Sequence, residues 1–273
     1  MDNEREQLVI GEKEKRLDSI LGKFDRVAVA FSGGMDSTYL LFRALIVLGR
    51  GNVLAVTIKS ELTGQAAVEE AAALAEKLGV EHQVLDLHLL SITAIGNNER
   101  NRCYYCKKTI YAKMLAAVIE RGWSILLDGS HVGDRFEERP GMRAITELNI
   151  RCPLQEAALD KKEIRALSWK AGLPTWDKPA EACFASRFPY GELLTTEKIW
   201  KVAEAEAFLR RMGMENEMRV RCHGQLARIE VDIKDFPVVL SRRRDIVSYF
   251  RNLGYLYVTL GLEGFSSGSM DRQ

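Results

Sequence analysis

Long apolar runs are missing from this chain of 273 residues. Stretches such as Ser-Ile-Leu-Leu at 124–127 and Phe-Pro-Val-Val-Leu at 236–240 are far shorter than the roughly 20 residues that a helix needs to cross a bilayer. An excess of charge is also missing, since 39 Lys and Arg face 38 Asp and Glu. A net charge of +1 gives no general attraction to nucleic acid or to lipid. The polar start, Met-Asp-Asn-Glu-Arg-Glu-Gln, excludes a secretory signal, so we expect a cytoplasmic protein with neither a membrane nor a nucleic-acid partner.

Cysteine and histidine are scarce. Five cysteines are an odd number in a chain of this size, which argues against a disulfide framework and favours a reducing compartment. The four histidines are scattered, and none has metal-ligand spacing to the cysteine pair discussed below. These counts exclude a disulfide-stabilised secreted domain and a simple zinc finger.

Short apolar segments alternate with helical periodicity over the first two thirds of the chain. Strands are expected at 26–31, 52–58, 81–87 and 124–129, and helices between them at 37–48, 65–79 and 106–121. Strands that alternate with helices form a parallel sheet covered on both faces. These units are too few to close a barrel, so the pattern predicts an α/β fold with an open, doubly wound, mostly parallel sheet.

The pattern changes after about residue 190. A helix over 195–213 precedes a period-2 alternation over 217–232 that is typical of an antiparallel hairpin, and a helix over 242–253 and a strand over 255–260 follow. This order predicts a smaller C-terminal α+β domain. We place the domains at 1–188 and 189–273, joined by a segment rich in Pro, Gly and small residues at 176–192. Such long irregular segments are usually functional or disordered.

The motif Ser-Gly-Gly-Met-Asp-Ser at 32–37 stands between the first strand and its helix, at the sheet edge where doubly wound folds bind ligands. Gly33 and Gly34 let the backbone approach an anion, the helix N-terminus attracts negative charge, and the Ser32 and Ser37 hydroxyls can donate to phosphate oxygens. Asp36 would repel a phosphate unless a cation joins them, which implies Mg²⁺. The alternative is a glycine turn with a serine N-cap.

A second segment, Leu-Leu-Asp-Gly-Ser-His-Val-Gly-Asp-Arg at 126–135, follows the fourth strand and is expected at the same edge. We predict that Asp128, Gly129 and Asp134 contact the nucleotide or Mg²⁺. A solvated turn is the alternative reading of either acid.

The spacing of three cysteines does not decide which kind of site they form. Cys103 and Cys106 form a C-x-x-C motif, which occurs in zinc sites, redox pairs and iron–sulfur sites. Cys183, in Glu-Ala-Cys-Phe-Ala-Ser-Arg, is the third cysteine, and the nearby Arg187 would lower the pKa of its thiol. Three thiolates leave one iron of a cluster open to an external ligand. Cys152 and Cys222 are expected to be structural.

Two arginines alternate on the first strand of the C-terminal hairpin. Arg219 and Arg221 share one face of that strand because side chains repeat every second residue. Such a pair is suited to clamp a phosphate or carboxylate, and a solvated strand face is the alternative.

The motif at 32–37 resembles the pyrophosphate loop, S-G-G-x-D-S, of the PP-loop ATP pyrophosphatase superfamily, whose enzymes cleave ATP between the α- and β-phosphates. Longer segments resemble the LarE family of ATP-dependent sulfur transferases, which build the nickel-pincer nucleotide cofactor. They are FSGGMDSTYL, NRCYYCKKTIYAKM, DGSHVGDRFEERPGMRAITEL, CPLQEAALDKKEIRALSWKAGLPTWDKPAEACFASRFPYGE and RVRCHGQLARIEV, from about residue 15 to about 260. The KPAEACFASRFPYGE block separates this family from other PP-loop enzymes.

The resemblance implies a reaction and a set of residues. ATP adenylates a carboxylate of pyridinium-3,5-biscarboxylic acid mononucleotide, pyrophosphate leaves, and sulfur on the enzyme displaces AMP to give a thiocarboxylate. The family's sulfur-bearing cysteine falls on Cys183, and its anion-binding arginines fall on Arg219 and Arg221. We expect Arg187 to bind the substrate together with these two arginines. Some members sacrifice that cysteine to dehydroalanine, whereas others hold a four-iron, four-sulfur cluster on three cysteines. Cys103 and Cys106 favour the cluster version here, although Cys152 stands where a serine is usual and leaves the third ligand open. The family also implies a homo-oligomer.

Three other readings remain. An amidoligase would use the same ATP loop with ammonia, a tRNA thiolase would use it on RNA, and a non-catalytic nucleotide-binding protein would only hold the nucleotide. The complete S-G-G-x-D-S motif argues against the last, and the balanced charge argues against an RNA substrate.

Overall fold

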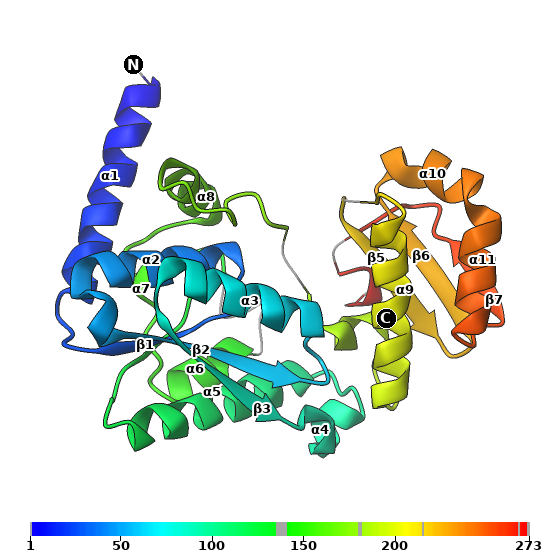
Figure 1. The fold of residues 1–273 in the computed structure, drawn as a ribbon, viewed down its shortest axis with the longest axis horizontal. Coiled ribbons are helices and arrows are strands. Elements are labelled where there is room, and N and C mark those ends of the chain that lie inside the picture. Colours follow the sequence, from blue (N-terminus) through cyan, green and yellow to red (C-terminus); the bar gives the residue numbers. More distant parts are fainter. Residues whose placement is uncertain (1, 135–140, 180–181, 215, 267, 272–273) are drawn as a thin grey trace. The chain divides into compact units, whose positions relative to one another are not determined.

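The computed structural model describes residues 2–134, 141–179, 182–214, 216–266 and 268–271, with the backbone alone for 2–6. The chain forms two compact units (Figure 1). The first unit consists of Met1–Leu87 and Cys103–Glu181, and the second of His88–Arg102 and Ala182–Gln273. In the described part of the chain, no helix combines the length and the apolar character needed to cross a membrane.

The first unit is built on a four-stranded parallel sheet in the order β3-β2-β1-β4. Its strands are β1 (Val27–Ala30), β2 (Val53–Ser60), β3 (Glu81–Leu87) and β4 (Leu126–Leu127). Its helices are α1 (Asp2–Leu21), α2 (Met35–Leu48), η1 (Arg50–Asn52), α3 (Gln65–Leu78), α5 (Arg102–Glu120), α6 (Gly141–Glu147), α7 (Pro153–Glu156) and α8 (Lys161–Lys170). The predicted α/β class is confirmed.

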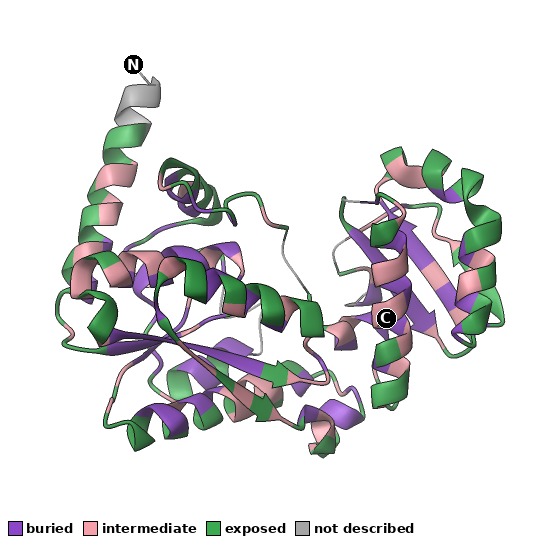
Figure 2. Ribbon diagram, in the orientation of Figure 1, coloured by how far each residue is buried: buried purple, intermediate pink, exposed green. Residues whose placement is uncertain are grey.

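Alternating side chains of the central strand serve two separate cores. Val27 and Val29 pack with residues of α1, α2, α3 and α8 on one face. Ala28 packs with residues of α5 and α6 on the other face. In Figure 2 the central strand β1 and most of β2 are accordingly buried, whereas the edge strand β3 is partly exposed. Figure 1 shows α2 and α3 on one side of the sheet and α5 and α6 on the other. A sheet covered on both faces is doubly wound, as predicted.

The strand order defines where a ligand can bind. The chain passes outward from β1 to β2 and β3, then returns to place β4 on the opposite side of β1. The switch point therefore lies between β1 and β4, and the loops after these two strands flank it. The fourth strand is shorter than the predicted 124–129, because only Leu126 and Leu127 pair with β1; Leu127 also forms an isolated bridge to Arg151.

The second unit contains a three-stranded sheet in the order β5-β6-β7. β5 (Met218–His223) and β6 (Leu226–Val231) form the predicted antiparallel hairpin, and β7 (Tyr257–Leu260) pairs parallel to β6. Its helices are η2 (Leu89–Ser91), α4 (Thr93–Gly96), η3 (Phe184–Arg187), α9 (Thr196–Arg211), η4 (Ile233–Asp235), α10 (Phe236–Ser241), α11 (Arg243–Asn252) and η5 (Ser269–Asp271). The α9 helix begins where predicted, because the Thr195 hydroxyl accepts a hydrogen bond from Lys198 N at 3.2 Å.

One segment of the second unit was not expected there. Residues 88–102 read as a polar loop of the first domain, yet the buried Asn98 side chain donates to the carbonyls of Pro189 at 2.7 Å and Phe188 at 3.2 Å. Leu194 N also donates to Gly96 O at 2.7 Å. The second unit is thus discontinuous in sequence. We predicted a domain boundary after residue 188. That the parts on either side fold independently stays a prediction.

Candidate active site

The loop between β1 and α2 is closed by its own hydroxyls. The Ser37 hydroxyl donates to Gly34 O at 3.2 Å and lies 3.1 Å from the Ser32 hydroxyl, which accepts from Gly34 N at 3.3 Å. Gly34 is the N-cap residue of α2, with no side-chain cap. The first-turn amides of a helix have no intrahelical acceptor, so this loop presents donors and a positive dipole end to an anion.

Two glycines of the site are required by close packing. Gly33 has a φ of +71°, and a Cβ there would lie 3.2 Å from Ala71 Cα of α3. A Cβ on Gly129 would lie 3.0 Å from Ser37 N. The loop after β4 therefore abuts the first turn of α2, which brings the two predicted ligand segments together at the switch point.

Asp36 has the properties of a cation ligand. Its Oδ1 is buried and has no hydrogen-bond donor among the described residues. Burial raises its pKa, whereas His131 and Lys161 act in the opposite direction and Asp134 adds to the rise. An orphaned carboxylate oxygen beside a second carboxylate fits Mg²⁺, whose ligands are oxygens. Asp134 itself accepts from His131 N at 3.1 Å, which fixes its carboxylate in the same turn.

The Asp128 carboxylate accepts hydrogen bonds from internal donors, and its predicted contact with the nucleotide or Mg²⁺ stays a prediction. Ser130 N donates to Oδ1 at 2.9 Å, the Ser130 hydroxyl also donates to Oδ1, and the Tyr111 hydroxyl donates to Oδ2. The Cys152 thiol lies 4.0 Å from the same Oδ1. Asp128 therefore shapes the turn that presents Gly129, and it ties that turn to α5 through the buried Tyr111.

The cysteines of the first unit have two different environments. Cys103 and Cys106 lie in the first turns of α5, where residues three apart share one side of the helix; Cys103 is exposed and Cys106 partly so. Cys152 is buried, and burial together with Asp128 raises the pKa of its thiol to about 12. Burial and the Asp128 carboxylate thus favour the protonated form of the Cys152 thiol, and the identity of the third cluster ligand stays a prediction. Within the described residues, no group of three Cys, His, Asp or Glu is assembled to hold a metal.

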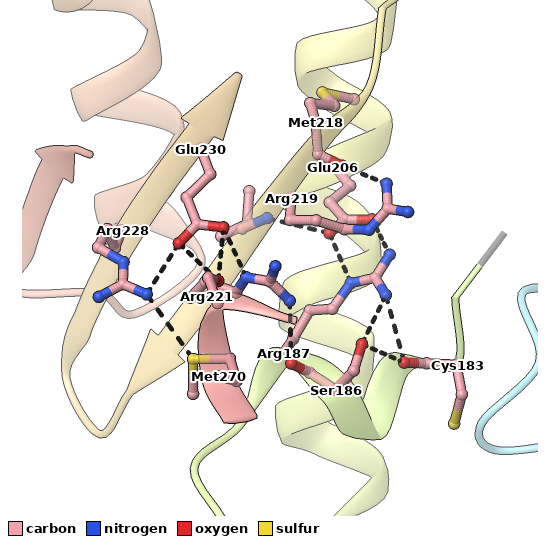
Figure 3. A network of polar contacts seen from close by, with 12 residues as sticks. Cys183, Ser186, Arg187, Glu206, Met218, Arg219, Arg221, Arg228, Glu230 and Met270 are labelled. Atoms are coloured by element: carbon pink, nitrogen blue, oxygen red, sulfur yellow. Dashed lines mark hydrogen bonds and ion pairs between the residues drawn. The ribbon is translucent and has the colours of Figure 1, made fainter. Parts of the chain in front are cut away.

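Cys183 is exposed and precedes η3 in the second unit. Arg187 donates to the carbonyl oxygens of Ala182 at 2.8 Å and Cys183 at 3.2 Å. In Figure 3 the Cys183 sulfur points away from that guanidinium. Arg187 thus holds the backbone of the cysteine loop, and the predicted lowering of the Cys183 pKa by Arg187 stays a prediction.

The predicted substrate arginines lie together in the second unit (Figure 3). Arg187, Arg219 and Arg221 are all buried, with exposed fractions of 7% or less. Arg187 pairs with Glu206 at 2.9 Å, and Arg221 pairs with Glu230 at 2.8 Å. Burial and then the neighbouring guanidinium of Arg187 lower the pKa of Arg219, with a smaller effect from Arg221. Arg219 also donates to Met218 O at 2.6 Å, so each of the three buried guanidinium groups has a partner within this unit.

The two glutamates were missed by sequence reasoning, although each leaves a signal. Glu206 lies on the apolar side of α9 with Val202 and Leu209, where an acid is out of place unless it has a partner. Glu230 lies directly opposite Arg219 in the hairpin register. An acid that faces an arginine-bearing strand indicates a cross-strand ion pair.

Comparisons with known proteins find relatives that cover almost the whole chain. The NAD synthase family model matches residues 14–112. The pyridinium-3,5-bisthiocarboxylic acid mononucleotide synthase of Lactiplantibacillus plantarum is 42% identical over 95% of this chain and 94% of its own length. An uncharacterized protein of Synechocystis sp. is 39% identical over 95% of this chain and 97% of its own. The tRNA-specific 2-thiouridylase MnmA of Azorhizobium caulinodans is 26% identical over 62% of this chain and 53% of its own.

A doubly wound sheet with a serine–glycine loop at its switch point defines an ATP-using enzyme of the PP-loop class. Full-length similarity then narrows the class. The chain belongs to the LarE family of ATP-dependent sulfur transferases.

Proposed function

We propose that this enzyme adenylates a carboxylate of pyridinium-3,5-biscarboxylic acid mononucleotide and converts it to a thiocarboxylate. The observation that carries the proposal is the full-length similarity to a synthase of the corresponding bisthiocarboxylic acid mononucleotide. The complete Ser-Gly-Gly-Met-Asp-Ser loop supports the ATP half of the reaction.

The first unit supplies the adenylation chemistry in this proposal. Amides of the first turn of α2 and the hydroxyls of Ser32 and Ser37 hold the leaving pyrophosphate. Asp36 and Asp134 would hold Mg²⁺, which neutralises phosphate charge when bound. The substrate carboxylate attacks the α-phosphorus, the bond to the β-phosphate oxygen breaks, and the product is an acyl-adenylate with a good leaving group.

The second unit supplies the substrate anchor. A mononucleotide carries a phosphate, and guanidinium groups bind phosphate through paired hydrogen bonds. The gathering of three buried guanidinium groups, those of Arg187, Arg219 and Arg221, supports binding of that dianion (Figure 3). We propose further that the enzyme is cytoplasmic and homo-oligomeric, as the family implies.

For the sulfur source we propose a four-iron, four-sulfur cluster on Cys103, Cys106 and Cys183. The C-x-x-C pair on one side of α5, exposed at Cys103 and partly exposed at Cys106, fits two of the ligands. The exposure of Cys183 supports it as the third, since burial and Asp128 raise the pKa of the Cys152 thiol. When bound, such a cluster carries a sulfide on the iron that has no protein ligand. The alternative is direct attack by the Cys183 sulfur, followed by loss of the Cα proton and formation of dehydroalanine.

Paired cysteine variants test both parts. With ATP and the mononucleotide under anaerobic conditions, Cys183→Ala should still release pyrophosphate but form no thiocarboxylate, because adenylation does not use the thiol. Cys103→Ala is the matched variant: it should also lose sulfur transfer if a cluster is the source, and should keep it if Cys183 is sacrificed. Mass spectrometry of the Cys183 peptide after turnover should find it unchanged under the cluster proposal. Loss of hydrogen sulfide from that peptide would establish sacrifice instead.

The same assay separates the other readings. Pyrophosphate release that needs tRNA would indicate a thiolase, and formation of an amide from ammonia would indicate an amidoligase. No pyrophosphate release with any acceptor would leave a nucleotide-binding protein. Normal thiocarboxylate formation by Cys183→Ala would show that another group transfers the sulfur.

A further inference from the structure

The segment after β7 is held by a backbone turn beside the buried ion-pair network of Arg187, Glu206, Arg219, Arg221 and Glu230, together with Arg228; we call this network the arginine cluster. Gly261 N donates to Ile229 O at 2.8 Å, and Phe265 N donates to Val231 O at 2.9 Å, so the chain stays beside β6 beyond the last strand. Between them Gly264 has a φ of +73°, and a Cβ there would lie 3.2 Å from Val231 O. Only glycine is comfortable at such a position, which marks the turn as a specified feature.

Three side chains of this segment, those of Phe265, Ser269 and Met270, each contact a different residue of the arginine cluster. The Phe265 ring lies under the Arg219 guanidinium, with 5.1 Å from Cζ to the ring centroid. The Ser269 hydroxyl lies 3.1 Å from both carboxylate oxygens of Glu230. The buried Met270 places its sulfur 3.7 Å from Arg228 Nη2, as Figure 3 shows.

The contacts form a chain that reaches the arginines through Glu230. That carboxylate accepts from Arg221 at 2.8 Å and from Arg228 at 2.8 Å. Ser269 therefore orients the acid that orients Arg221, while Phe265 limits where Arg219 can turn. An arginine side chain loses rotamer entropy when it becomes ordered on binding a phosphate. Contacts that orient the guanidinium beforehand reduce this loss.

We propose that Phe265 and Ser269 are positioning residues for the substrate phosphate, acting through Arg219 and Arg221. In this proposal the C-terminal segment is part of the substrate site. This inference rests on the proposed function of the arginines as the phosphate anchor.

Point variants test the inference by comparing the KM for the mononucleotide with the KM for ATP. Ser269→Ala removes the hydroxyl, and Phe265→Leu keeps an apolar side chain but removes the ring. Each should raise the KM for the mononucleotide about five- to tenfold, the usual scale for one charge-assisted contact, with kcat and the KM for ATP within about twofold of wild type. Ser269→Thr retains the hydroxyl and should restore the wild-type KM. Ser241→Ala is the matched control, because that hydroxyl caps an exposed carbonyl in α10.

A separate variant keeps the inference and the proposed function distinguishable. Arg219→Gln should raise the mononucleotide KM more than either C-terminal variant does, since it removes a direct ligand. If Arg219→Gln raises that KM and Ser269→Ala and Phe265→Leu do not, the positioning role is wrong while the anchor stands. If Arg219→Gln leaves that KM unchanged, the anchor itself is wrong and the inference falls with it. A rise in the ATP KM, or failure of Ser269→Thr to restore, would show a general structural effect and also overturn it.

Discussion

Gly129→Ala adds one methyl group at the contact between the loop after β4 and the first turn of α2. The new Cβ would lie 3.0 Å from Ser37 N, 3.2 Å from Ser37 Cα and 3.3 Å from Asp36 C. All three are backbone atoms, so no side chain can rotate away. Gly129 is not among the residues with positive φ, and alanine therefore brings no backbone strain of its own. Since carbon atoms in contact prefer about 3.5–4.0 Å, the loop and the helix must separate by about half an ångström.

That separation should affect both stability and ATP use. Overpacking of this kind costs about 1–3 kcal/mol of unfolding free energy. It also moves the amides that face the pyrophosphate, so we expect kcat/KM for ATP to fall about tenfold, equivalent to about 1.4 kcal/mol.

The assay is pyrophosphate release at varied ATP, with thermal unfolding measured on the same samples. Gly51→Ala is the control, because a Cβ there has nothing within 4 Å and the φ is not positive. If Gly129→Ala kept the wild-type kcat/KM for ATP, the loop after β4 would not set the position of the first turn of α2, and the steric argument would be refuted.

Two further predictions concern charge and burial. Asp36→Asn removes the carboxylate whose Oδ1 is orphaned, so pyrophosphate release should fall about 100-fold and Mg²⁺ with ATP should no longer raise the melting temperature; retention of that Mg²⁺-dependent stabilisation would exclude Asp36 as a ligand. Cys152, whose thiol pKa is about 12, should resist iodoacetamide at neutral pH in native iron-free protein while Cys103 and Cys183 react; equal labelling of all three would contradict its protected state.

The parallel sheet and the ATP loop could be predicted from the sequence because their signals are local. Apolar runs, a helical period and glycines mark β1, the loop and α2 in a single stretch of about 20 residues, and the ligand position follows from strand order. The early end of β4 could not be predicted from the sequence. It depends on Asp128, whose partners Tyr111 and Cys152 lie 17 and 24 residues away.

The second unit was harder because its assembly is non-local. The placement of 88–102 depends on hydrogen bonds from Asn98 to residues 90 and 91 positions further on. The roles of Phe265 and Ser269 depend on a backbone anchor to Val231 and on Glu230, which no local pattern connects to them. Tertiary hydrogen bonds of this kind override what a polar stretch suggests on its own.

Burial of three arginines in the second unit is energetically costly, which supports the proposed phosphate anchor. Desolvation of a buried ion pair commonly cancels its attraction, so apolar residues of similar size would stabilise a small three-stranded unit equally well or better. Arg187, Arg219 and Arg221 are nevertheless buried, at 4–7% exposure. Burial and the like charge of Arg187 lower the pKa of Arg219, so the arrangement disfavours its charged form. A bound phosphate would offset both effects, which supports the proposal that these arginines bind the substrate phosphate.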